Sequence, residues 1–198
     1  MENSVDSLQK LLMQLAGVLP QDALPLLNLT RVVNIDAQDI YIREGESSRK
    51  VAFIQKGIIR AYCINDSGDE FTLFLRWEGQ IIASHDSIIN HQPSRFIYRA
   101  LEPVSLLEID YDVLEKTLKM QPEYEPLRTF FLMRMLSDSL KGIEAFVTQS
   151  PEERYCNLIS ERIDLVNRVP DKYIASMLGI TPVSLSRIRS RMNTKRKL

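Results

Sequence analysis

Residues 171–191 read DKYIASMLGITPVSLSRIRSR and carry the strongest structural signal in the chain. Gly179 can adopt the left-handed conformation of a turn residue. Thr181-Pro182 is a typical helix start, with a capping hydroxyl followed by proline in the first turn. Asp171 is the predicted cap of the preceding helix, which should end at Leu178. The pattern therefore predicts two short helices joined by a tight turn.

Two helices joined by so short a turn must cross steeply, so their contact requires a small side chain on the first helix. Ala175, four residues before Gly179, meets this requirement. Apolar residues occupy the inward positions of a helix-turn-helix, a common DNA-binding motif, at Ile174, Leu178, Ile180, Leu185 and Ile188. The alternative is a tight helical hairpin in an unrelated α-helical domain.

The outward face of the second helix is the predicted DNA-reading surface. Arg187 is the candidate for bidentate hydrogen bonds to guanine, Val183 for contact with a thymine methyl group, and Ser184 for a further base contact. Other outward polar residues are predicted to contact phosphates. They are Lys172, Thr181, Ser186, Arg189, Arg191, Lys195 and Arg196.

The distribution of charge supports a partner that is a polyanion. The chain has a net charge of −1, but residues 1–120 hold 12 Lys/Arg and 17 Asp/Glu, whereas residues 151–198 hold 10 and 5. No acidic residue follows Asp171. This asymmetry favours a C-terminal module that contacts nucleic acid, and the alternative is a solvated basic tail.

The segment before this module predicts a long helix over about 127–147. Leu132, Leu136, Leu140, Ile143 and Val147 recur at steps of 4, 4, 3 and 4, and further apolar residues widen the stripe. A helix with more apolar surface than one packed face needs is typical of a dimer interface, so a homodimer is expected. The alternative is an ordinary core helix. The segment Ser150-Pro151-Glu152-Glu153 then predicts a capped helix running to about Val166.

The N-terminal part predicts an antiparallel β structure. Short runs rich in Val, Ile, Phe and Tyr alternate with Gly-containing turns, which is typical of a roll, barrel or sandwich. A short helix should follow the last strand, capped by Asp110 and ending near Met120. The predicted strands are Val32–Ile35, Ile40–Arg43, Val51–Ile54, Ile58–Ile64, Phe71–Arg76, Phe96–Ala100 and Val104–Ile109.

Over nearly its whole length the sequence resembles the Crp/Fnr family, and most strongly its short members common in Bacteroidetes. The resemblance rests on 174–182 (IASMLGITP), on 184–189 (SLSRIR) and on the Ser150–Arg154 helix start. It also rests on the segment 43–46 (REGE), the predicted strand 56–60 (KGIIR) and the predicted hairpin at 66–68 (DSG). It implies an α+β protein with an N-terminal cyclic-nucleotide-binding-like antiparallel β-roll (a double-stranded β-helix) over 1–120. A dimerisation helix and hinge over 121–149 and a helix-turn-helix domain over 150–198 would follow. It also implies a cytoplasmic regulator that binds double-stranded DNA, with RNA polymerase as a candidate partner.

The resemblance breaks down at the nucleotide cassette. Members that bind cyclic AMP hold the ribose with a glutamate and the phosphate with an arginine; Ser84 and Ser94 stand at these positions, and Arg95 is expected to face away. We therefore predict a degenerate effector pocket that does not bind cyclic AMP, with an unknown effector. Its candidate lining residues are Phe71, Leu73, Ile82, Ala83, Ser84, Arg95 and Tyr98.

Other functions find less support in the sequence. Cys63 and Cys156 lack metal-site spacing, and His85 and His91 alone do not make a metal site, so neither a metal nor a cofactor is expected. An enzyme on a cupin-like roll would need clustered His and carboxylate ligands, so no enzymatic activity is expected. No apolar run reaches the roughly 18 residues of a membrane span. The alternative function is a small-molecule-sensing module whose helical C-terminal domain contacts protein rather than DNA.

Overall fold

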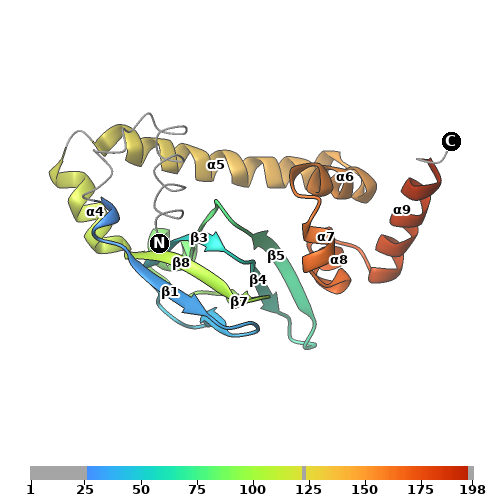
Figure 1. Ribbon diagram of the computed structural model, residues 1–198, viewed down its shortest axis with the longest axis horizontal. Coiled ribbons are helices and arrows are strands. Elements are labelled where there is room, and N and C mark those ends of the chain that lie inside the picture. The colour runs from blue at the N-terminus through green and yellow to red at the C-terminus, as the bar shows by residue number, and fades with distance from the viewer. Residues whose placement is uncertain (1–25, 122–123, 196–198) are drawn as a thin grey trace. The chain divides into compact units, whose positions relative to one another are not determined.

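The computed structural model describes residues 26–121 and 124–195, shown in Figure 1. The chain groups into two compact units. Of the described residues, one unit comprises those up to Cys63 together with those of Leu75–Met135, and the other comprises Ile64–Phe74 and those from Leu136 onwards. The predicted phosphate contact Arg196 lies outside the described residues.

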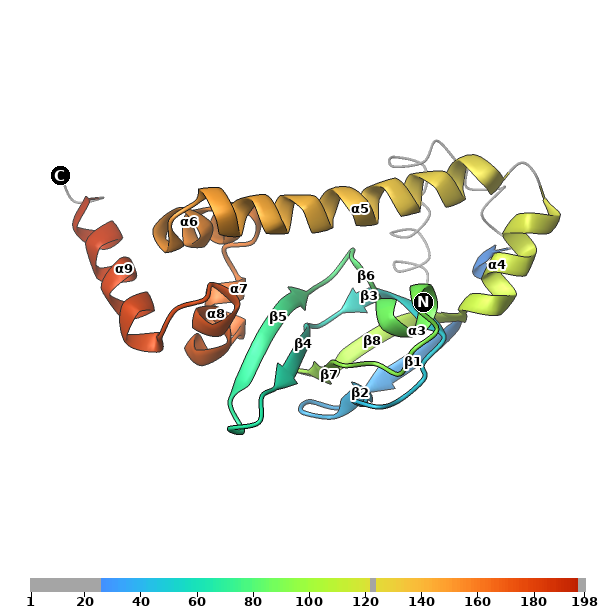
Figure 2. The ribbon, with the colours of Figure 1, turned by 180° about the vertical axis from the view of Figure 1, so that it is seen from behind.

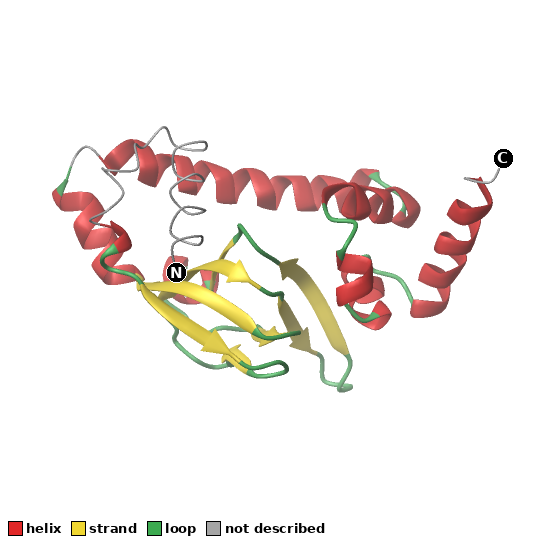
Figure 3. Cartoon of the chain, viewed as in Figure 1, coloured by secondary structure: helices red, strands yellow, loops and turns green. Residues whose placement is uncertain are grey.

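In the described part of the chain, eight strands form two four-stranded sheets. The strands are drawn in yellow in Figure 3. The first sheet has the order β1-β8-β3-β6, with antiparallel pairing of β1 to β8, of β3 to β8 and of β3 to β6. The second has the order β2-β7-β4-β5, with β7 antiparallel to both β2 and β4. The strand bounds are β1 Arg31–Ile35, β2 Ile40–Ile42, β3 Lys50–Lys56, β4 Ile59–Ile64, β5 Glu70–Arg76, β6 Ile81–Ala83, β7 Ile97–Ala100 and β8 Val104–Asp110.

The seven predicted strands are all present, with ends shifted by one or two residues, and the sheets confirm the predicted antiparallel β structure. Within residues 31–110, two elements were not predicted: β6 and the short helix α3, which spans His85–Ile89. Ser84 caps α3 by accepting a hydrogen bond from the Ser87 amide, and this cap ends β6 after three residues. A strand of three residues is too short to show an alternating pattern in the sequence.

The buried side chains of the sheets are mainly aliphatic. Ile42, Ile54, Ile59 and Leu106 have no exposed surface. Gly57, with a φ of +95°, is required before β4, because a Cβ atom there would lie 2.7 Å from the carbonyl oxygen of Pro103.

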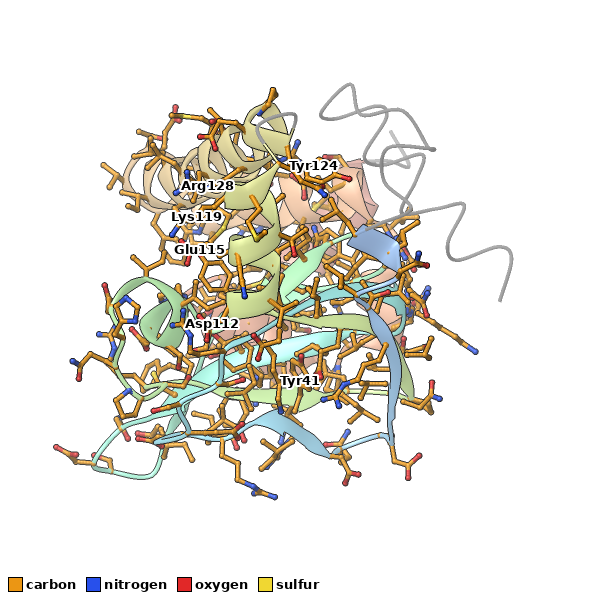
Figure 4. The ribbon with its side chains drawn as sticks, turned by 90° about the vertical axis from the view of Figure 1, so that its left-hand side faces the viewer. Tyr41, Asp112, Glu115, Lys119, Tyr124 and Arg128 are labelled. Atoms are coloured by element: carbon orange, nitrogen blue, oxygen red, sulfur yellow. The ribbon has the colours of Figure 1, made fainter. Side chains whose placement is uncertain are left out.

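Two carboxylates in this part of the chain, one buried and one exposed, are bound by arginines. The Glu108 carboxylate accepts a hydrogen bond from the Tyr41 hydroxyl at 2.8 Å and another from Arg31 Nε at 2.9 Å. Arg49 binds the Asp112 carboxylate at the start of α4 (Tyr111–Met120), with Nε 2.8 Å from Oδ2. Figure 4 labels Asp112 of α4 and Tyr41 of β2.

The predicted cap of α4 is confirmed, because Asp110 accepts hydrogen bonds from the amides of Asp112 and Val113. The long helix α5 spans Glu125–Thr148. The following helix α6, Pro151–Glu161, begins with the predicted capping box, in which Ser150 and Glu153 each bind the other's backbone amide.

The prediction that this helix runs to Val166 is wrong. It ends at Glu161, where Arg162 adopts φ −152° and ψ 88° and so leaves the helical conformation. The guanidinium groups of Arg162 and Arg168 then converge on Asp164, with distances of 2.8 Å and 2.7 Å, and stabilise a turn. A separate short helix α7 follows at Leu165–Arg168.

Candidate nucleic-acid interface

The predicted helix pair is present as α8, Asp171–Met177, and α9, Pro182–Lys195 (Figure 2). Gly179 has the predicted left-handed conformation, with φ of +69°. Thr181 Oγ1 accepts a hydrogen bond from the Ser184 amide at 3.2 Å and so caps α9. The local signals of turn and helix start are therefore confirmed.

The predicted inward residues pack between the two helices. Ile174, Ala175 and Leu185 have no exposed surface, and Leu178 and Ile188 are buried. Ile180 is only half-buried, because it lies in the turn rather than on either helix. The small Ala175 side chain leaves room for the crossing, as its complete burial shows.

Asp171 does not cap α8 as predicted. The N-cap residue is Pro170, and Asp171 is the first helical residue. Its carboxylate instead accepts two hydrogen bonds from Arg189 Nη1, both at 2.8 Å. Since Arg189 Nε also donates to the Tyr155 hydroxyl at 2.9 Å, this arginine connects α9 to α8 and α6. Arg189 therefore holds three helices together, a structural role that the charge pattern of the sequence did not reveal.

The outward face of α9 matches the sequence prediction in exposure. Arg187 and Ser186 are exposed, Val183 is 62 % exposed, and Ser184 is half-buried. A groove lies between the start of α6 and α9. Its polar lining includes Ser150, Glu152, Ser184, Arg187 and Arg191.

The other predicted phosphate contacts differ in exposure and in their partners. Lys172 and Thr181 are exposed. Arg191 is exposed and forms an ion pair of 3.3 Å with Glu152. Lys195 is the last residue of α9, and its side chain lies outside the described part of the structure.

The candidate effector pocket is brought together only in part. Ile82, Ser84 and Tyr98 are buried, Ala83 is half-buried, and the Tyr98 hydroxyl donates a hydrogen bond to the Ala83 carbonyl oxygen at 3.2 Å. Burial raises the pKa of Tyr98 to about 12, so its hydroxyl stays protonated at neutral pH.

Phe71 and Leu73 do not belong to this buried cluster. They are 52 % and 45 % exposed, whereas Thr72 and Leu75 of the same strand are buried. Alternate residues of a strand face opposite sides, so Thr72, between Phe71 and Leu73, takes an inward position. Leu75 lies on the same side of the strand as Phe71 and Leu73 by this alternation, so its burial depends on its place along β5.

Sequence reasoning missed an ion pair beside this cluster. The buried carboxylate of Asp86 accepts a hydrogen bond from the Arg95 amide at 3.0 Å and binds the Arg95 guanidinium, with Nη2 2.9 Å from Oδ1. These hydrogen bonds lower the pKa of the Asp86 carboxyl against the opposing effect of burial. Ser94 is 2 % exposed, whereas the Arg95 side chain is 71 % exposed.

The histidines of this loop have ordinary partners. The His85 ring lies 5.7 Å from the Phe96 ring, and His91 Nδ1 lies 3.3 Å from Arg49 Nη1. Within residues 26–121 and 124–195, no group of three or more His, Cys, Asp or Glu side chains is arranged to hold a metal ion. None of the helices described there is long and apolar enough to cross a membrane.

Comparison with known proteins finds a matching domain family and similar regulatory proteins. The profile of the cyclic nucleotide-binding domain family matches residues 32–121. The fumarate and nitrate reduction regulatory protein of Vibrio cholerae is 25 % identical over 164 residues, which is 75 % of this chain and 63 % of that protein. The chain thus spans less than two thirds of the length of this relative.

Solved structures share the fold. FixK2 from Bradyrhizobium japonicum superposes with a TM-score of 0.70 at 16 % identity, covering 84 % of this chain and 85 % of FixK2. A CooA variant from Carboxydothermus hydrogenoformans gives a TM-score of 0.64 at 18 % identity, covering 86 % of this chain and 79 % of CooA.

Proposed function

We propose that this chain, which belongs to the Crp/Fnr family, is a sequence-specific DNA-binding transcription regulator that acts as a homodimer. The observation that carries the proposal is the helix pair α8 and α9, whose exposed face presents Arg187, Ser186 and Val183. In this proposal α9 enters the major groove of DNA as a recognition helix. The chain is then a regulator rather than an enzyme, with RNA polymerase as a further candidate partner.

The predicted DNA contacts of the helix pair and of the residues after it divide into two roles. Val183, Ser184 and Arg187 contact bases, and Lys172, Thr181, Ser186, Arg191, Lys195 and Arg196 contact phosphates. Arg189 holds α9 against α8 and α6, because its guanidinium is already bound to Asp171 and Tyr155. This role replaces the phosphate contact predicted from the sequence.

The dimer in this proposal forms through α5. Its described apolar side chains are exposed over much of the helix circumference, which is costly in water unless another surface covers them. A second copy of α5 would cover them and would place two recognition helices about 34 Å apart, one turn of DNA. The exposed residues are Leu132, Met133, Met135, Leu136, Leu140, Ile143, Phe146 and Val147. The domain limits remain those predicted: a sensor domain over 1–120, a dimerisation helix and hinge over 121–149, and a DNA-binding domain from 150.

Binding to genomic DNA tests this function. We expect the purified protein to select a discrete set of near-palindromic fragments from genomic DNA, and its affinity for them to fall steeply with salt as phosphate-bound counterions are released. Gel-shift titrations at several salt concentrations measure this. If the immobilised protein reproducibly retained other proteins but no DNA, the result would favour the alternative of a protein-binding helical domain.

The effector domain is proposed not to bind cyclic AMP. A phosphate anion and ribose hydroxyls can be desolvated only where charged or hydrogen-bonding partners replace water. Ser84 and Ser94 provide no charge, and the nearby Arg95 is already bound to the Asp86 carboxylate. The domain therefore lacks a free cation for the ligand's phosphate at these positions.

Titration calorimetry with cyclic AMP and cyclic GMP measures this directly. We expect no heat of binding at micromolar ligand, because each missing charge-assisted contact costs about 1.5–3 kcal/mol and two are missing. A dissociation constant in the low micromolar range for either nucleotide would contradict the prediction. It would mean that Arg95 leaves Asp86 to bind the ligand.

A further inference from the structure

We propose that Arg154 is a positioning residue that fixes the recognition helix pair to the end of the dimerisation helix. Arg154 lies in the first turns of α6, shortly after Gln149 and Ser150, which separate α5 from α6 and form the proposed hinge. The inference rests on the proposed function, because it concerns how a dimer presents two recognition helices to one DNA site. All the contacts that carry it lie within the second compact unit.

The guanidinium of Arg154 joins three segments, of which one lies 24 residues away in sequence. Nη1 donates to the Gln149 carbonyl oxygen at 2.6 Å and approaches that of Ala145 at 3.5 Å. Nη2 donates to the Leu178 carbonyl oxygen at 2.7 Å. One side chain of α6 thus binds the C-terminal end of α5, the hinge and the C-terminal end of α8.

The charge of Arg154 suits this position. The last carbonyl groups of a helix have no partner within the helix, and the helix dipole makes that end negative. The ends of α5 and α8 both meet this one cation, since Ala145 lies in the last turn of α5 and Leu178 is the C-cap of α8. A planar guanidinium carries its donors on separate nitrogens in a fixed geometry and so reaches both ends at once, whereas the three donors of a lysine ammonium share one nitrogen.

Packing holds the guanidinium in this orientation. Its Cζ atom lies 4.5 Å from the centre of the Phe146 ring, on the last turns of α5. Gly179 follows Leu178, and a Cβ atom at this position would lie 3.2 Å from Phe146 and 3.9 Å from Arg154 Nη2. The turn between α8 and α9 is therefore in close contact with the same arginine and ring.

In this arrangement one residue, Arg154, controls how the two recognition helices of a dimer are placed on the two half-sites of the DNA. In a dimer joined through α5, the position of each recognition helix depends on how α8 and α9 attach to the end of that helix. Loosening the attachment leaves each DNA-binding unit able to read its own half-site. It lowers the effective concentration of the second unit at the second half-site, so that the gain from binding both sites is reduced.

The experiment compares the full-length wild-type protein with Arg154→Met and Arg154→Lys on a full palindromic site selected from the genome and on a single half-site. For Arg154→Met we expect the dissociation constant for the full site to rise at least about tenfold, while that for the half-site changes less than about twofold. Arg154→Lys should recover part of the loss. Inserting or removing one base pair between half-sites should weaken wild-type binding strongly and weaken Arg154→Met binding little.

A matched control is Arg162→Met, which removes a guanidinium of the same unit that binds Asp164 two residues away. We expect this variant to keep the wild-type ratio of full-site to half-site affinity. Circular dichroism and light scattering establish that all variants are folded dimers. If Arg154→Met loses affinity for both sites equally, or for neither, the proposal is overturned. A wild-type protein that binds neither site overturns the proposed function itself.

Discussion

A double substitution Leu140→Asp and Ile143→Asp is expected to convert the protein into a monomer and to weaken binding to its full palindromic site by about 10²–10⁴-fold. Leu140 and Ile143 are 56 % and 61 % exposed, so the charges disturb no interior packing within one chain. In a dimer they would place four carboxylates in an apolar interface, where burying each charge is costly. Light scattering at micromolar concentration and gel shifts measure the two effects.

Lys141→Glu is the matched control for this pair. Lys141 lies between the two positions in sequence but on another side of α5, and it is exposed. We expect this variant to remain dimeric with nearly unchanged DNA affinity. The dimer proposal fails if the wild-type protein is monomeric at micromolar concentration, or if the double variant stays dimeric.

The elements that could be predicted from the sequence are those specified by neighbouring residues. The capping box of α6 depends on Ser150 and Glu153, and the turn before α9 depends on Gly179 and Thr181. Each of these signals spans only a few residues, and the structure shows each as predicted. The strands were found for the same reason, because their alternating apolar positions are a local pattern.

The features that escaped prediction depend on residues distant in sequence or on competing local contacts. Aspartate is a common helix cap, so Asp171 was predicted to bind the backbone amides of α8, but its carboxylate binds Arg189 of the next helix instead. The three carbonyl contacts of Arg154 span up to 24 residues and leave no pattern in the sequence. The extended Arg162 ends α6 early, although the apolar spacing beyond it continues to suggest a helix.

The arginines of α9 show why composition alone cannot assign contacts to DNA. Arg187 and Arg189 are two residues apart and equally basic, yet one is exposed and the other has its guanidinium bound to Asp171 and Tyr155. Positions two apart on a helix point about 200° from each other, so a single helix cannot present both to the same groove. A charge count treats the two arginines alike, whereas the structure shows that Arg187 is a surface residue and that Arg189 holds helices together.

Arg187→Ala is accordingly expected to weaken binding to the selected site by about 1–3 kcal/mol, which is roughly 5- to 150-fold, and to remove the preference for guanine at one position of each half-site. The exposed Arg187 side chain packs against no core, so the free energy of unfolding should stay within about 0.5 kcal/mol of the wild-type value. Its exposure on α9, one turn beyond Val183 and Ser184, is what places its donors within reach of a base edge in the proposed complex.

Lys172→Ala provides the contrast, because Lys172 is exposed on α8 and is assigned to a phosphate. A phosphate contact carries no sequence information, so this variant should weaken binding to all sequences alike. It should also reduce the slope of log affinity against log salt by about 0.9 for each phosphate that the variant no longer neutralises. Binding measured across a panel of single-base variants of the site, at two salt concentrations, separates the two kinds of residue. If Arg187→Ala bound every member of the panel as tightly as the wild-type protein, the assignment of Arg187 to a base would be wrong.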